Sequence, residues 1–171
     1  NGHDGEVKGA TLAADRHGKG NSAYSFDGVD DYLNVPHQST LNIPNGLTLS
    51  AWVKPDENAT QTIITKGNYQ QDNYDFALHL YGGQVSYSWR TPAGHHEVKT
   101  AHGVVGAGNW QHLSVTHNSG QQPKIYVDGL EQAVTAFYDQ TAARVFFNKP
   151  ITIGMNPESP TPGQNRHYVD G

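Results

Sequence analysis

Residues that could bind a polyhydroxylated ligand gather in one short segment of the chain. The amide, carboxylate and phenol groups of this segment belong to Asn68, Tyr69, Asp72, Asn73 and Tyr74. Planar hydrogen-bonding groups fix the orientation of hydroxyl groups, and an aromatic ring packs against the apolar C–H side of a sugar ring. The same residue types also keep an ordinary hairpin loop hydrated. The segment therefore indicates either a sugar-binding loop or a polar loop without a ligand.

A hairpin follows this segment and brings further polar side chains to the same end of a sheet. Residues 74–81 and 84–90 alternate apolar and polar side chains, which predicts two strands. Gly82-Gly83 between them predicts a two-residue turn, because glycine adopts positive φ without a steric penalty. The second strand of such a hairpin ends where the first begins, so we expect Arg90 close to Asp72. The predicted ligand site therefore also includes Arg90, His95 and His96.

Three carboxylates flank a glycine within one predicted turn, and they belong to Asp27, Asp30 and Asp31. Such a turn can place carboxylate and carbonyl oxygens at the distance of about 2.3 to 2.6 Å that Ca²⁺ requires. The chain has no cysteine, which excludes disulfides and thiolate sites and makes a hard cation the expected metal. Aspartate and glycine also form turns without a metal, each carboxylate capping nearby backbone. A calcium site and a capped turn both remain possible interpretations.

The histidines, tryptophans and serines give weaker signals. There are 10 histidines, but His95 and His96 are adjacent, so on a strand they point to opposite faces and cannot chelate one ion together. We therefore expect no zinc site. Trp52, Trp89 and Trp110 are large enough to be stacking platforms, but we expect them in the core. No Gly-x-Ser-x-Gly nucleophile turn is present, which argues against a serine hydrolase.

The composition is typical of short strands joined by tight turns. The 171 residues suffice for one domain with a sizeable core. A hydrophobic content of 35%, with 19 Gly, 9 Pro and 9 Tyr, favours strands over helices. The formal net charge of −5, with only 11 Lys and Arg, argues against nucleic acid and anionic membranes as partners. No apolar run approaches the about 18 residues of a membrane span, so membrane insertion is not expected either.

Period-two segments recur along the chain at 47–54, 110–117, 123–128 and 130–136. Turn signals arrive about every ten residues, which is typical of a sandwich or jelly roll. We therefore predict an all-β antiparallel sandwich that forms one domain over residues 1–171. The residues predicted to face its core are Leu49, Ala51, Val53, Phe76, Leu78, Val85, Leu113, Val115, Ile125 and Val127.

Several motifs recur in the order known from one family. They are FDG at 26–28, DDY at 30–32, SAWVK at 50–54, WQHLSVT at 110–116, KIYVDG at 124–129 and ITIG at 151–154. In this order and spacing the chain resembles the laminin-G-like, concanavalin A-like domains of bacterial secreted proteins. The resemblance covers nearly the whole chain. It implies a β-sandwich that serves as a binding module.

The resemblance implies a non-catalytic, carbohydrate-binding or adhesive module of a larger secreted or surface protein, located outside the cell. A protein-binding or spacer domain is the alternative, since laminin-G-like sandwiches serve in all these ways. A glycoside hydrolase or polysaccharide lyase is less well supported. The Glu-x-Asp-x-x-Glu pattern of laminarinase-type hydrolases is absent, as are the Gln-x-His and Tyr-x-Lys strands of alginate lyases.

The resemblance also bears on calcium and on the chain ends. The family often holds a structural Ca²⁺ near its paired first and last strands. A strand would precede the opening Asn1-Gly2 and an acidic strand would follow the closing Tyr168-Val169-Asp170-Gly171. We therefore expect the chain to be a fragment that lacks both strands, or one completed by another segment.

Overall fold

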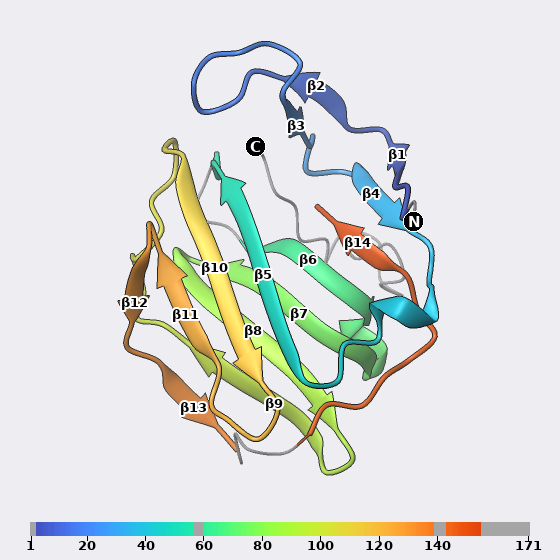
Figure 1. Cartoon of the computed structure of the whole chain (residues 1–171). Helices are drawn as coiled ribbons and strands as arrows, with labels where there is room; N and C mark the ends of the chain where they lie inside the picture. The colour runs from blue at the N-terminus through green and yellow to red at the C-terminus, as the bar shows by residue number, and fades with distance from the viewer. Residues whose placement is uncertain (1–2, 57–59, 139–142, 155–171) are drawn as a thin grey trace.

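The computed structural model describes residues 3–56, 60–138 and 143–154, and these form an antiparallel β-structure with no α-helix. Two sheets of eight and four strands lie face to face, and a two-stranded sheet extends beyond one end of them (Figure 1). None of the described residues forms a helix of the length and hydropathy that a membrane crossing needs. The predicted fold class is confirmed. The predicted ends of the chain include residues 168–171, which lie outside the described residues.

The larger sheet gathers strands from all parts of the chain. In order across the sheet these are β1 (Glu6–Lys8), β4 (Tyr32–Val35), β14 (Ile151–Ile153), β6 (Gln61–Asn68), β7 (Asn73–Tyr81), β8 (Gln84–Thr91), β9 (Gly94–Lys99) and β13 (Thr135–Phe137). The central strands β6 to β9 follow one another in sequence and are joined as hairpins. The turn between β7 and β8 is the predicted one, with φ of 58° at Gly82 and 74° at Gly83.

The smaller sheet consists of β12 (Leu130–Gln132), β11 (Lys124–Val127), β10 (Gln111–Asn118) and β5 (Gly46–Val53). Along β5 the burial alternates as the period-two pattern predicts. The segment predicted as one strand over 130–136 is in fact two strands in different sheets. β12 pairs with β11, whereas β13 pairs with β9 of the larger sheet. The chain therefore crosses between the sheets here, which a single alternating pattern does not reveal.

Two shorter elements complete the described structure. The two-stranded sheet is formed by β2 (Thr11–Ala13) and β3 (Ala23–Ser25), and the 3₁₀ turns are η1 (Ser39–Leu41) and η2 (Tyr69–Gln71). The loop between β2 and β3 lies above the ends of β5 and β10 (Figure 1). η2 follows β6 directly and precedes β7, so it is the connection that carries the predicted ligand loop.

The core between the two sheets contains the predicted residues. All ten belong to the hydrophobic core, nine of them buried and Ala51 partly buried against it. The three tryptophans differ in burial. Trp89 is buried as predicted, Trp110 is half-buried, and Trp52 is 43% exposed. The prediction that Trp52 lies in the core is wrong, because residue 52 lies at an outward position of β5, between inward-facing Ala51 and Val53.

The larger sheet is buried on both faces at its centre. Leu78 and Leu80 face the core, so the alternating residues Ala77 and His79 point away from the smaller sheet, yet both are at most 1% exposed. We call this side the outer face of the larger sheet. Buried polar side chains on this face include His79, Ser86 and Ser88. Sequence patterning missed β6 altogether, because its run of buried residues on both faces does not alternate.

Candidate functional site

Two local features fix the conformation of the predicted ligand loop. Gly67, just before it, has a φ of 98°, and a Cβ there would lie 2.4 Å from the carbonyl oxygen of Asn73. Only glycine fits this close approach. Asn68 is buried, and its Oδ1 accepts a hydrogen bond of 3.1 Å from the backbone N–H of Gln71. Asn68 therefore shapes the loop rather than facing solvent.

Asp72 and Arg90 meet at the end of the sheet, as the hairpin geometry predicts. The Arg90 guanidinium lies 3.3 Å from the Asp72 carboxylate. The Asp72 side chain is 64% exposed and that of Arg90 22% exposed, so the pair borders solvent. Asp72 has a positive φ of 57°, which directs the chain from η2 back into β7. Asn73 beside it is half-buried, with its amide nitrogen 3.5 Å from Oε1 of Gln71.

An aromatic cluster adjoins this ion pair on the outer face of the larger sheet. The ring centroid of Tyr69 lies 5.0 Å from that of Tyr74, 5.0 Å from that of His79 and 5.6 Å from that of His95. The hydroxyl of Tyr74 is hydrogen-bonded to Nδ1 of His95. The ring centroid of Tyr81 lies 5.6 Å from that of His79 and extends the cluster. Tyr69 thus covers the cluster from above, which explains why the strand residues beneath it are buried.

Burial keeps this cluster uncharged near neutral pH. Desolvation raises the pKa of Tyr69 to about 12 and raises the pKa values of Tyr74 and Tyr81 still further. Desolvation also lowers the pKa of His95, although Glu97 and Asp72 oppose this shift. The phenols therefore keep their protons and the imidazole stays neutral. The site presents neutral donors and acceptors beside one exposed ion pair.

His96 lies on the other face of β9, as the parity of adjacent residues predicts. It is 3% exposed, its ring stacks on Trp89 at 5.4 Å, and its Nε2 lies 2.8 Å from the Thr91 hydroxyl oxygen. His95 and His96 nevertheless border one hollow of about 370 Å³ together with Ala93 and Tyr138. Tyr138 follows the edge strand β13 and lies 6.5 Å and 6.1 Å from the two histidine rings. The structure thus buries Asn68 inside the loop and places His96 on the opposite face of β9. The other predicted ligand residues, Tyr69, Asp72, Asn73, Tyr74, Arg90 and His95, lie around the loop.

The predicted site does not include the polar side chains that continue the outer face of the larger sheet across β8 and β9. Oε1 of Glu97 accepts a hydrogen bond of 2.6 Å from the Ser86 hydroxyl, and its Oε2 lies 2.8 Å from Nζ of Lys99. Nζ of Lys99 lies 5.4 Å from the ring centroids of both Tyr81 and Phe137. The signal was present in the polar side chains that alternate along the two strands, at residues 79 and 81 and at 86, 88 and 90.

The three predicted metal ligands also lie together, in the connection between β3 and β4. One carboxylate oxygen from each of Asp27, Asp30 and Asp31 lies within 4.8 Å of the others. The turn is capped as well. Oδ1 of Asp27 accepts the backbone N–H of Val29 at 2.8 Å, and Oδ2 of Asp31 accepts the N–H of Asp27 at 2.9 Å. Among the described residues no hydrogen bond or ion pair reaches the Asp30 carboxylate. Capping therefore leaves oxygens of the kind that calcium prefers.

The sequence pattern of the concanavalin A-like lectin/glucanases superfamily matches residues 27–170. The chain belongs to this superfamily. The predicted resemblance is thereby confirmed. The motifs on which it rests fall on the connection between β3 and β4 and on β5, β10, β11 and β14 of the superfamily sandwich. None of the curated proteins with which the sequence was compared matches it.

Solved structures share the sandwich at low sequence identity. The binding domain of Paraclostridial Mosquitocidal Protein 1 superposes with a TM-score of 0.69 at 15% identity, over 98% of this chain and 40% of its own. Domains LG4-5 of the mouse laminin alpha1 chain superpose with a TM-score of 0.66 at 15% identity, over 85% and 38%. The receptor binding domain of botulinum neurotoxin D superposes with a TM-score of 0.64 at 15% identity, over 99% and 45%.

These likenesses establish the fold of this superfamily member. The chain spans less than half of the length of each of the three structures. Two of the three are described as binding domains, one of them as a receptor binding domain. The laminin-G-like sandwich thus occurs in binding modules, while the superfamily name also includes glucanases.

Proposed function

We propose that this domain is a non-catalytic carbohydrate-binding module of a secreted or surface protein. Its ligand site is formed by the loop 68–74 together with Arg90 and His95. The observation that carries the proposal is the exposed pair of Asp72 and Arg90, 3.3 Å apart, beside the aromatic cluster around Tyr69.

The chemistry of the site suits hydroxyl groups. The Asp72 carboxylate accepts hydrogen bonds and the Arg90 guanidinium donates them. A sugar hydroxyl can both donate and accept, so it can form a charge-assisted hydrogen bond with each group. The two groups neutralise each other, which favours an uncharged sugar over a strongly anionic one. Tyr69 is half-buried and lies beside them, so its ring is placed to pack against the C–H side of a pyranose.

The neutral state of the cluster supports binding rather than catalysis. The high pKa values of Tyr69 and Tyr74 and the low pKa of His95 leave these groups in their uncharged forms. A general acid or base works best with a pKa near the operating pH. The motifs of the hydrolases and lyases with this architecture are absent from the sequence as well.

Calcium is part of the proposal as a structural ion. Asp27, Asp30 and Asp31 would hold it, because their carboxylate oxygens lie close together and match the preference of Ca²⁺ for hard oxygen ligands. The ion would fix the turn that joins β3 to β4. It would take no part in the ligand site, which is formed by other strands.

A glycan array on the purified domain, with and without calcium, tests the proposal. We expect retention of neutral glycans by the parent and loss of this retention in Tyr69→Ala. His17→Ala, in an exposed loop distant from the site, is the matched control and should bind as the parent does. If the folded domain retains no glycan on the array, carbohydrate binding is rejected, and the protein-binding or spacer function is left.

A further inference from the structure

Trp52 lies in an unusual position for a large aromatic side chain. It is 43% exposed on β5, pointing away from the core on the outer face of the smaller sheet. Hydroxyl residues lie on the same face of this sheet. Ser50 is paired with Ser114, and Ser114 with Tyr126. The face therefore carries hydroxyl groups together with an exposed indole.

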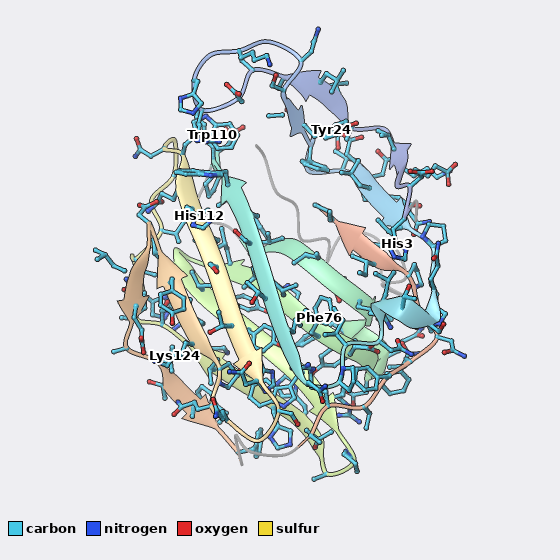
Figure 2. All side chains as sticks on the ribbon, in the orientation of Figure 1. His3, Tyr24, Phe76, Trp110, His112 and Lys124 are labelled. Atoms are coloured by element: carbon cyan, nitrogen blue, oxygen red, sulfur yellow. The ribbon has the colours of Figure 1, made fainter. Side chains whose placement is uncertain are left out.

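Two further side chains hold Trp52 in place. The guanidinium carbon of Arg16, in the loop between β2 and β3, lies 4.4 Å from the centroid of the indole ring. The His112 ring, on the neighbouring strand β10, lies 5.2 Å from it at a tilt of 50°. Nε2 of His112 is itself fixed by Ser50, whose hydroxyl oxygen is 2.7 Å away. Figure 2 shows His112 and Trp110 at the end of β10 that lies beneath the β2–β3 loop.

Arg16 is stacked but not paired with an acid. Within the described part of the chain, no carboxylate oxygen lies within 4.0 Å of its guanidinium nitrogens. A stacked guanidinium keeps its N–H groups in its own plane, and these form a fork that fits a carboxylate. An anionic group placed at the rim of Trp52 would therefore find an oriented and unpaired cation.

We propose that Arg16, Trp52 and His112 form a second carbohydrate-binding site, for pyranoses that carry a carboxylate. The exposed part of the indole and the His112 ring would contact the sugar ring. Arg16 would pair with the sugar carboxylate, and Ser114 and Tyr126 would lie within reach of further hydroxyl groups along the sheet. This site lies on the outer face of the smaller sheet. It is independent of the loop 68–74, which belongs to the larger sheet.

A purely structural contact is the competing explanation. Stacking of Arg16 on Trp52 tethers the β2–β3 loop to the sandwich, and this alone would contribute to stability. The two explanations differ in what removal of the charge does. A tether predicts a lower melting temperature and no ligand, whereas a binding site predicts a loss of affinity for acidic sugars that exceeds the loss for neutral ones.

The test is a titration of the parent domain with trigalacturonate and with the neutral galactotriose, followed by calorimetry. We expect binding of trigalacturonate in preference to galactotriose. Trp52→Ala should weaken trigalacturonate binding by about fivefold or more. Arg16→Gln should remove the preference for the acidic sugar. Lys124→Gln, on the same face but two strands away from Trp52, is the matched control for nonspecific charge and should bind as the parent does.

Melting curves show whether each variant is folded, and Arg16→Lys keeps the charge while losing the planar fork, so it should bind more weakly than the parent. Absence of trigalacturonate binding by the parent at millimolar concentration would overturn the proposal. Equal affinities of the parent and a folded Trp52→Ala variant would overturn it too.

Discussion

The hydroxyl of Tyr87 lies 3.0 Å from Nδ1 of His117, and this contact joins the two sheets across the core. Tyr87 belongs to β8 and His117 to β10, and His117 also lies edge-on to Trp89 with ring centroids 4.6 Å apart. Because both residues are almost fully buried, desolvation disfavours the charged form of the imidazole. Burial thus requires His117 to stay uncharged near neutral pH.

This requirement predicts a loss of stability in acid. Burial, with a smaller contribution from Arg144, lowers the pKa of His117 from 6.5 to about 3. The unfolded chain therefore binds a proton at a pH at which the folded chain does not. The stabilising contribution of neutral His117 is complete above pH 6.5 and is lost as the pH falls toward 3, at up to about 1.4 kcal/mol per pH unit.

Urea unfolding between pH 7.5 and 4.5 checks this prediction. The free energy of unfolding of the parent should fall more steeply with decreasing pH than that of His117→Gln. His17→Gln, which changes an exposed histidine, should keep the slope of the parent. Equal slopes for the parent and His117→Gln would show that folding does not lower the pKa of His117.

Leu78 is a test of the core. It is 0% exposed on β7, so Leu78→Ala should lower the free energy of unfolding by about 2 to 5 kcal/mol through lost burial and a cavity. Leu130→Ala is the matched control, because this leucine is 71% exposed at the start of β12 and should cost little. Similar losses for both variants, measured by urea unfolding, would contradict the assigned strand faces.

Loss of a buried ion pair should lower the free energy of unfolding more than loss of an exposed one. Nζ of Lys66 lies 2.6 Å from Oδ2 of Asp75 with both side chains at most 2% exposed, and Phe147 adds a hydrogen bond to each. Lys66→Met leaves a buried carboxylate unpaired and should cost about 3 to 5 kcal/mol. The control is Lys124→Met in the exposed pair with Glu131, where we expect no measurable change. A small effect at Lys66, with urea unfolding as the measurement, would mean that Asp75 is neutral in the folded protein.

The calcium proposal predicts a metal-dependent melting temperature. An ion that binds only the folded domain adds about 2.7 kcal/mol at a hundredfold excess over its dissociation constant. Chelator should therefore lower the melting temperature of the parent, and Asp30→Asn should abolish the difference between chelator and calcium. Asp56→Asn, an exposed aspartate outside the cluster, should behave as the parent does. Identical melting curves for the parent in chelator and in calcium would reject the site.

Period-two patterning predicted the strands in which apolar and polar side chains alternate along the sequence, including β7 and β8, which are buried on both faces. β5, β10 and β11 alternate in burial, and every residue predicted for the core is at least partly buried there. Patterning failed for β6, which is buried on both faces, and it joined β12 to β13, which lie in different sheets. Burial by distant segments cannot be read from a local pattern.

The candidate site was predictable where a hairpin fixed its geometry. The two glycines between β7 and β8 returned Arg90 to Asp72, which local sequence could foresee. The cover that Tyr69 forms over His79, and the position of Tyr138 at the edge of β9, depend on tertiary packing. Trp52 was misplaced because burial statistics for tryptophan outweighed its outward parity on β5.

If a neutral glycan binds at Asp72 and Arg90, the dissociation constant of a glycan that the array retains must depend on both side chains. Asp72→Asn and Arg90→Gln should each weaken binding by about 1 to 3 kcal/mol, which is roughly five- to 150-fold, with nearly unchanged melting temperatures. Lys124→Gln should leave the dissociation constant as it is. If both Asp72→Asn and Arg90→Gln bind the glycan as tightly as the parent, the site lies elsewhere on the sandwich.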